Sequence, residues 1–127
     1  MDTGVAFAHA LADKDRDGLL KLIDPAVDFR GLTPGRDWDA VDANDLVDRV
    51  ILGSWFEPSD QIDELESVER GDVVDRQRVA YRLVLSSGGQ RYLCEQQAYY
   101  LTESDKITWL RILCSGFREL DSAPALG

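Results

Sequence analysis

The sequence predicts an α+β protein in which three N-terminal helices lie on a strongly curved, mainly antiparallel sheet. Helix-type patterns dominate the first 53 residues, and three long strand-like runs follow one another between residues 76 and 118. This order fits a layered arrangement with helices on one side of the sheet, in one domain spanning residues 1–127. Long strands twist and curl, so we expect a cone-shaped roll with a hollow between the sheet and the helices.

The first part of the chain predicts short elements separated by turn-forming residues. Residues 3–12 are expected to form a helix with Thr3 as its N-cap, and residues 19–23 a second, short helix capped by Asp17. Valine, phenylalanine and glycine alternate along residues 26–33, which predicts a strand that ends at a Pro-Gly turn.

A third helix and an edge strand are expected next. Residues 36–39 are interpreted as a connector to a helix that opens at Asp42, carries one apolar face and ends at Gly53. An aromatic loop follows at residues 55–58. Residues 62–70 carry apolar side chains at intervals of three with acidic residues between them, which indicates an exposed edge strand.

The three long strands are expected at residues 76–86, 90–102 and 106–118, which are rich in β-branched and aromatic side chains. Gly-Gly at residues 88–89 and Ser-Asp at residues 104–105 predict tight hairpin turns. Both faces of the resulting sheet are too apolar to be left in water. Helices would cover one face, and we expect a second copy of the protein to cover the other in a homodimer.

The charge and the hydropathy pattern exclude several classes of protein. The net charge of −10 argues against nucleic acids and anionic membranes as partners, because phosphate groups attract basic surfaces. No apolar run is long enough to span a membrane and no signal-peptide pattern occurs, so a cytoplasmic location is expected. In that compartment Cys94 and Cys114 are expected to be buried, reduced thiols. No phosphate-binding glycine loop or zinc-ligand set occurs, and no cofactor is predicted.

Four aspartates after the first helix match the ligand spacing of a calcium-binding EF-hand loop. They are Asp13, Asp15 and Asp17, with Asp24 at the twelfth position. The apolar run that begins at residue 19 has a helical pattern, whereas a calcium loop needs an irregular backbone there. A structural turn that caps the second helix is therefore the preferred interpretation, and no metal is predicted.

The order of elements and two stretches of sequence resemble the nuclear transport factor 2-like superfamily, in particular its SnoaL-like and ketosteroid-isomerase-like group. The stretches are AVDFRGLTPG at residues 26–35 and EQQAYYLTESDKITWLRILCSGFREL at residues 95–120. The resemblance covers nearly the whole chain and implies the cone-shaped fold, commonly as a homodimer. It does not imply one reaction, because the superfamily contains isomerases, cyclases, dehydratases, epoxide hydrolases and binding modules.

The resemblance to the isomerase-like members also implies which face of the sheet lines the cavity. It places Gln97 at a cavity-facing position, so Glu95 and Tyr99 would point the same way, and the hairpin register sets Arg82 opposite Glu95. A carboxylate held by an arginine in an apolar cone can act as a base, which makes Glu95 and Arg82 the catalytic candidates. The alternative is a cross-strand ion pair on a half-exposed face. The further candidate ligand contacts are Cys114, Ile112, Leu110, Trp38, Trp55, Phe56, Arg30 and His9.

The sequence departs from the pattern of the enzymes in this group. The first helix carries Phe7 and His9 where the isomerase-like members need a tyrosine. An epoxide-hydrolase-like triad would need a second carboxylate beside Arg82 and Glu95, and Asp28 is the only candidate.

We therefore expect a small-molecule-binding domain with an apolar conical pocket and a polar Arg/Glu/Gln/Tyr cluster. The alternative is a cofactor-independent acid–base enzyme, an isomerase, cyclase, dehydratase or epoxide-hydrolase-like protein, acting on a hydrophobic, oxygenated substrate. A second alternative is a protein-interaction module whose outer sheet face, with Tyr100 and Trp109, docks another protein.

Overall fold

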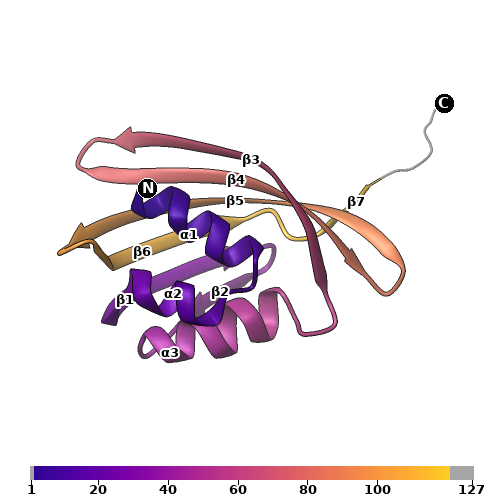
Figure 1. Cartoon of the computed structure of the whole chain (residues 1–127), viewed down its shortest axis with the longest axis horizontal. Coiled ribbons are helices and arrows are strands. Elements are labelled where there is room, and N and C mark those ends of the chain that lie inside the picture. The colour runs from indigo at the N-terminus through magenta and orange to yellow at the C-terminus, as the bar shows by residue number, and fades with distance from the viewer. Residues whose placement is uncertain (1, 121–127) are drawn as a thin grey trace.

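Seven strands form one curved sheet, and the helices lie on its concave side (Figure 1). The computed structural model describes residues 2–120. The strand order is β2-β1-β6-β5-β4-β3, and β7 pairs with β5 outside this path. The elements are α1 (Thr3–Ala12), α2 (Arg16–Leu22), β1 (Ile23–Thr33), β2 (Arg36–Asp39), α3 (Ala43–Asp45), the π-helix η1 (Leu46–Trp55), β3 (Gln61–Val73), β4 (Arg76–Ser87), β5 (Gln90–Glu103), β6 (Lys106–Cys114) and β7 (Arg118–Glu119).

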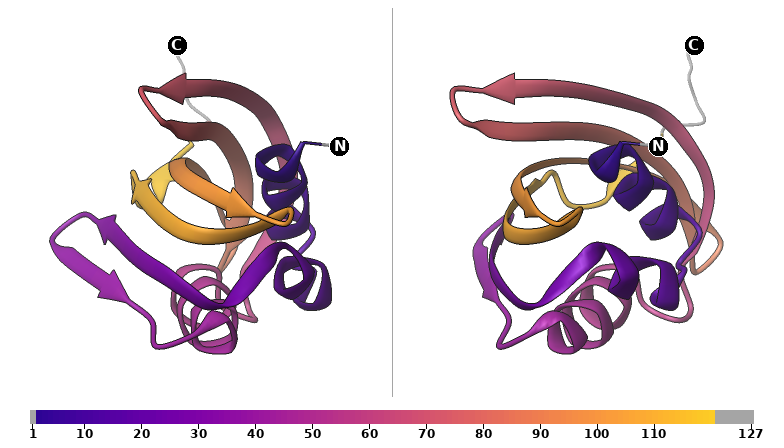
Figure 2. Two further views of the ribbon diagram at one scale, coloured as in Figure 1. Left: turned by 90° about the vertical axis from the view of Figure 1, so that its left-hand side faces the viewer. Right: turned by 60° about the vertical axis from the view of Figure 1, so that its left-hand side comes forward.

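The sheet curls around the helices, as the length of its strands predicts. Figure 2 shows β3 and β4 bending over α1, while β1 and η1 close the opposite side. β1 runs parallel to β6, and the other strand pairs are antiparallel. The predicted α+β class and the curved, mainly antiparallel sheet are confirmed.

The helix caps differ from the sequence predictions at two of three positions. Asp2, not Thr3, caps α1, and its carboxylate accepts a hydrogen bond from the backbone N–H of Val5. Asp15, not Asp17, caps α2 and accepts from the Gly18 N–H at 3.0 Å. α2 therefore begins earlier than predicted, and the stretch that a calcium loop would keep irregular is helical.

The third helix begins after Asp42, as predicted, but continues beyond Gly53 to Trp55. Most of it is a π-helix, whose hydrogen bonds join residues five apart, and at its end the Phe56 N–H donates to the Ile51 carbonyl at 2.9 Å. Trp55 therefore lies one turn after Val50 on the buried face, and it belongs to the helix and the core, whereas the prediction assigned it to an aromatic loop. The segment predicted as a connector, residues 36–39, is the edge strand β2.

Positive φ angles at the central residues confirm both predicted hairpin turns. Gly88 and Gly89 have φ angles of +58° and +84°, and Ser104 and Asp105 have angles of +52° and +65°. Positive φ at both central residues is the requirement of a tight two-residue hairpin turn. β6 ends at Cys114 instead of residue 118, because the chain leaves the sheet before β7.

The prediction of which face of β4 and β5 points toward the helices is wrong. Cys94, Gln96 and Tyr100 point toward the helices and are buried, whereas the odd-numbered Glu95 and Gln97 are exposed on the outer face. A β-bulge between β5 and β6 explains part of the error. The pairing changes from Thr102 opposite Ile107 to Leu101 opposite Trp109, so one extra residue of β6 reverses its faces relative to the predicted register. Leu110, Ile112 and Cys114 consequently face the helices, as predicted, but not beside Glu95.

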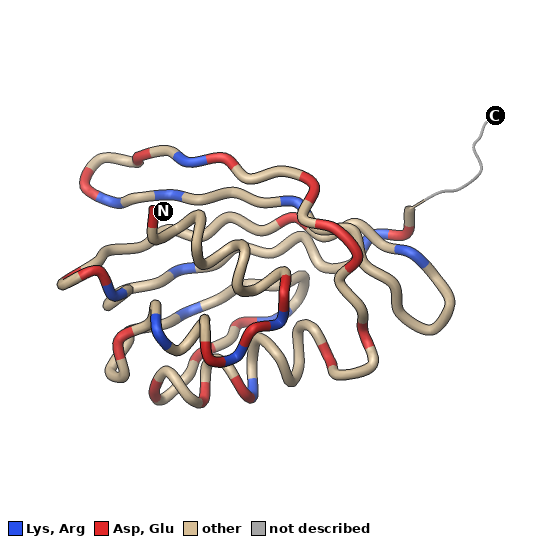
Figure 3. Tube along the Cα trace, viewed as in Figure 1, with Lys and Arg blue, Asp and Glu red and all other residues tan. Residues whose placement is uncertain are grey.

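The core lies between the concave face and the helices. α1 contributes Phe7 and Leu11, and η1 contributes Leu46 and Ile51, all of them buried. Figure 3 shows acidic residues along β3 and in the turns at the ends of the helices. No helix within residues 2–120 is long and apolar enough to cross a membrane.

Candidate functional site

The predicted Arg82–Glu95 pair exists, and it lies on the outer face of the sheet. Arg82 donates to Glu95 Oε2 from Nε at 3.2 Å and from Nη2 at 3.0 Å, and its Nη1 donates to Glu66 at 3.3 Å. The two carboxylates, Glu95 first, raise the pKa of Arg82 above its ordinary value. The side chains of Arg82 and Glu95 remain 44% and 49% exposed, so water screens the pair.

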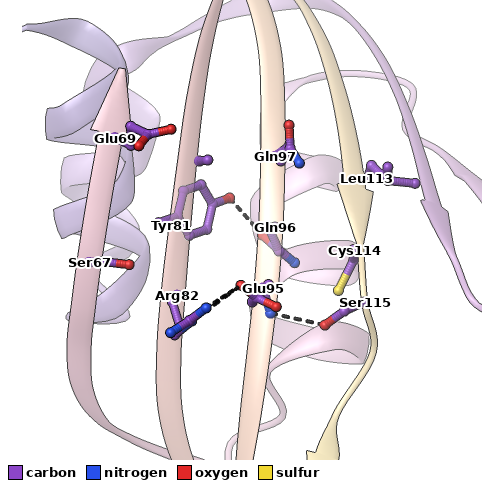
Figure 4. A pocket seen from close by; sticks show the side chains of 11 residues that line it. Ser67, Glu69, Tyr81, Arg82, Glu95, Gln96, Gln97, Leu113, Cys114 and Ser115 are labelled. Atoms are coloured by element: carbon purple, nitrogen blue, oxygen red, sulfur yellow. Dashed lines mark hydrogen bonds and ion pairs between the residues drawn. The ribbon is translucent and has the colours of Figure 1, made fainter. Parts of the chain in front are cut away.

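A broad hollow of about 600 Å³ surrounds this pair, and we call it the Glu95 pocket (Figure 4). Gln97, predicted as a ligand contact, contributes to its wall and is exposed. The expectation that this cluster lines a cone beneath the helices is wrong, because the pleat directs it to the opposite face. The full lining is Ser67, Glu69, Ala80, Tyr81, Arg82, Glu95, Gln96, Gln97, Leu113, Cys114 and Ser115.

A second hollow, the Tyr99 pocket, has a volume of about 340 Å³. Four predicted ligand contacts line it, Arg30, Trp38, Tyr99 and Ile112. Leu32 and Leu113, which are about half exposed, line it as well. Its full lining is Arg30, Gly31, Leu32, Asp37, Trp38, Tyr99, Arg111, Ile112 and Leu113.

The proposed third member of an epoxide-hydrolase-like triad is elsewhere. Asp28 pairs with Arg111 at 3.2 Å, whereas Arg82 pairs with Glu66 and Glu95. The structure thus does not bring Asp28 together with Arg82 and Glu95 into that triad.

The Trp55 pocket, of about 360 Å³, lies where the end of η1 meets the ends of β1, β4 and β6. Four predicted ligand contacts line it: Trp38, Trp55, Phe56 and Cys114. Phe117 completes the aromatic wall, with its ring stacked on Phe56 at 5.9 Å between centroids. The remaining lining residues are Thr33, Ser54, Glu57, Asp60, Ser87 and Gly116. This volume and this apolar wall fit a small-molecule site.

The two tryptophans of this pocket differ in one respect. Trp38 donates its indole N–H to Thr33 Oγ1 at 2.8 Å. The indole N–H of Trp55 is buried and has no hydrogen-bond partner within residues 2–120. The Trp55 ring is fixed by edge contacts with Phe29 and Trp38, at 6.0 and 6.1 Å between centroids. A rigid, dry donor without an acceptor costs stability unless a ligand supplies one.

A second buried polar group was missed by the sequence analysis. Tyr81 on β4 donates to Gln96 Oε1 on β5 at 2.6 Å, and both residues are buried. Burial raises the pKa of Tyr81 well above its ordinary value, so the phenol stays protonated and remains a donor. The amide Nε2 of Gln96 has no partner within the described residues. The signal was present in the hairpin register, which sets Tyr81 directly opposite Gln96.

The two remaining predicted ligand contacts line none of the three pockets described above. Leu110 is buried in the core, and His9 is exposed on α1. Within residues 2–120, no three His, Cys, Asp or Glu side chains are grouped as metal ligands would be.

Comparison with known proteins identifies the fold. No family model and no curated protein matches the sequence. A proposed isomerase from Bacillus subtilis superposes with a TM-score of 0.70 at 12% identity, over 89% of this chain and 84% of that one. A proposed polyketide cyclase from Pseudomonas putida gives 0.65 at 13% identity, over 88% and 90%. A nuclear transport factor 2-like protein from Burkholderia thailandensis gives 0.61 at 18% identity, over 88% of each chain. The curved sheet, the three helices on its concave side and these superpositions show that the chain has the nuclear transport factor 2-like fold.

Proposed function

We propose that the protein is a small-molecule-binding domain whose site is the Trp55 pocket. Its ligand has a flat apolar ring system and carries a hydrogen-bond acceptor. The observation that carries the proposal is the aromatic wall of this pocket, to which Trp55 contributes, together with the buried Trp55 indole N–H, which has no hydrogen-bond partner within residues 2–120. An acceptor on the ligand would satisfy that donor in a dry environment, where the bond is worth most.

The test compares aromatic ketones with hydrocarbons of the same shape. One hydrogen bond in a buried site is worth about 1.4 kcal/mol, so the ketone should bind about tenfold more tightly. Trp55→Phe should abolish this preference, because it keeps an aromatic ring but removes the donor. Trp38→Phe is the matched control, since Trp38 lines the same pocket but already has Thr33 as its acceptor. Equal binding of ketone and hydrocarbon to the wild type, or a preference that persists in Trp55→Phe, would contradict the proposal.

An acid–base enzyme is the second candidate, and the two hydrogen bonds that Arg82 donates to Glu95 Oε2 support it. Glu95 would act as the base in the Glu95 pocket, and Arg82 would orient it. Glu95→Gln would then lower turnover by about 10²-fold or more. Glu69→Gln is the control, because Glu69 lines the same pocket but is bonded to Arg78. The half exposure of the pair argues for the binding function over this one.

We also propose that two copies associate through the outer face of the sheet. Leu32 and Leu113 are 47% and 49% exposed on that face, beside the half-buried Tyr99. Leu113→Arg should convert a dimer into a monomer in light scattering, whereas Val74→Arg, at an exposed turn, should not.

A monomeric wild type would instead favour the protein-interaction alternative. Of the two residues predicted for that surface, only Trp109 remains available, because Tyr100 is buried on the inner face. The cytoplasmic location stays a prediction.

A further inference from the structure

Two thiols whose chemistry neither proposed function requires lie together inside the sheet. Cys94 on β5 and Cys114 at the end of β6 are both free and buried, with their sulfurs 3.6 Å apart. Gln96, not Cys94, is the residue directly opposite Cys114, so the two cysteines are diagonal neighbours on one face. A disulfide has a sulfur–sulfur length of about 2.05 Å, so a further approach of about 1.5 Å would join them.

The two cysteines have different access to solvent. Cys114 lines both the Trp55 pocket and the Glu95 pocket and is 8% exposed, whereas Cys94 is fully buried and lines neither. A small reagent that enters the Trp55 pocket therefore meets Cys114 first.

The surroundings of Cys114 favour its ionised form. The Cys94 thiol is in hydrogen-bonding contact with the Cys114 sulfur, and the backbone N–H of Gly116 donates to that sulfur at 3.4 Å. The Cys94 contact is the largest cause that lowers the pKa of Cys114, against the opposing effect of burial, and the Gln96 amide acts in the same direction. Because Gln96 Nε2 forms no hydrogen bond within the described residues, it acts as a nearby dipole. The same contact, and then burial, raises the pKa of Cys94.

We propose that Cys114 and Cys94 form a dithiol that hydroperoxides oxidise to an intramolecular disulfide, with Cys114 as the attacking thiol and Cys94 as the resolving one. The Cys114 sulfur bonds to one peroxide oxygen, and the O–O bond breaks. The other oxygen leaves as water or an alcohol with the proton that Cys114 released, and Cys114 becomes a sulfenic acid. The Cys94 sulfur then bonds to the Cys114 sulfur, and the sulfenic oxygen leaves as water with the Cys94 proton. The two thiols together give two electrons to the hydroperoxide.

The position of Cys114 makes the second step feasible. Cys114 is the last residue of β6, and the chain beyond it is held by Ser115, which bonds to the backbone of Glu95. The strand end is thus anchored to β5 beside Cys94, and the sulfurs approach one another without separation of the two strands.

The test exposes the native protein to hydrogen peroxide and measures its intact mass. The wild type should lose about 2 Da as the two thiols become a disulfide, and a thiol reductant should reverse the change. Cys94→Ser should stop at a Cys114 sulfenic acid that dimedone traps, whereas Cys114→Ser should keep its remaining thiol unmodified. The proposal would be overturned if the wild type kept both thiols. It would also be overturned if dimedone trapped Cys94 in Cys114→Ser as fast as it trapped Cys114 in Cys94→Ser.

A second measurement needs no variant and covers the case in which a substituted protein does not fold. Iodoacetamide should alkylate Cys114 at least about tenfold faster than Cys94 in the native wild type, as peptide mapping resolves. The difference should disappear in urea, where both thiols are exposed. Equal rates in the native protein would refute the assignment of Cys114 as the attacking thiol.

Discussion

The hydrogen bond between Tyr81 and Gln96 offers the sharpest test of how the core is built. The phenol O–H donates to Gln96 Oε1 at 2.6 Å, with both residues buried, and the Tyr81 ring makes an edge contact with Phe7 at 6.4 Å between centroids. Tyr81→Phe removes only the hydroxyl and preserves the ring contact. Gln96→Met removes the amide while keeping a similar length and volume.

The expected change in the free energy of unfolding depends on which buried polar groups each substitution leaves without a hydrogen-bond partner. Tyr81→Phe leaves the Gln96 carbonyl buried and unpaired, which costs about 1–3 kcal/mol. Gln96→Met leaves the Tyr81 hydroxyl without its acceptor at a similar cost, but it also removes the amide nitrogen that has no partner within residues 2–120, so the two effects nearly cancel. The double variant contains neither group and should be at least as stable as the wild type. The coupling energy between the two sites should therefore be about 1–3 kcal/mol.

Urea unfolding followed by far-ultraviolet circular dichroism measures these free energies. With a slope of about 2 kcal/mol per molar urea, a loss of about 2 kcal/mol moves the midpoint by about 1 M. The four proteins form one cycle, and the wild-type slope should be retained in each. If the destabilisation of the double variant equals the sum of the two single effects to within about 0.5 kcal/mol, the two residues are not coupled and the reasoning is refuted.

Two further predictions concern the start of the third helix and the wall of the Trp55 pocket. Asp45 accepts from the Val41 N–H and from Arg49, and these bonds, Arg49 first, lower its pKa from 3.8 to about 2. Asp45→Asn should therefore lower the free energy of unfolding by about 1 kcal/mol near neutral pH. In urea unfolding at a series of pH values, this loss should shrink as the pH falls from 3.8 through about 2, where the wild-type carboxylate protonates. A loss that is the same at pH 2 and pH 7 would contradict the prediction. Gly31 packs behind the Trp55 ring, and a methyl added there would lie 2.9 Å from the Phe29 ring and 3.0 Å from the Trp55 ring. Gly31→Ala should therefore cost about 1–3 kcal/mol and weaken ketone binding in a titration. Unchanged binding would place the ligand elsewhere.

The turns and element order of this fold were predictable because short-range chemistry determines them. Gly88 and Gly89 adopt positive φ angles, so the hairpin register, and with it the pairing of Arg82 with Glu95, follows from the sequence. The end of the third helix was not predictable in the same way. A π-helix has wider turns than the α-helix that the apolar pattern indicated, and its extra length buries Trp55.

The inner and outer faces of strands β4 to β6 could not be told apart from the sequence, for a physical reason. Alternation identifies a buried face only when the other face is polar, and here the outer face carries Tyr99 and Leu113 while the inner face carries Gln96. The bulge opposite Leu101 then reversed the register of β6, and no turn residue marks it. Leu110, Ile112 and Cys114 were therefore assigned to the correct face but grouped with the wrong neighbours.

The two buried donors without partners point to the same conclusion about the core. Within residues 2–120, Trp55 Nε1 and Gln96 Nε2 are the buried side-chain nitrogen or oxygen atoms that lack a hydrogen bond. Trp55 lines the Trp55 pocket, Gln96 lines the Glu95 pocket, and Cys114 lines both. An apolar residue at position 96 would be nearly neutral for stability, because relief of the buried amide nitrogen offsets the loss of the Tyr81 partner, so stability alone does not require glutamine there. These two donors, which have no partner within residues 2–120, support the proposed small-molecule-binding function, because an acceptor on a ligand would satisfy a donor that the fold leaves unpaired.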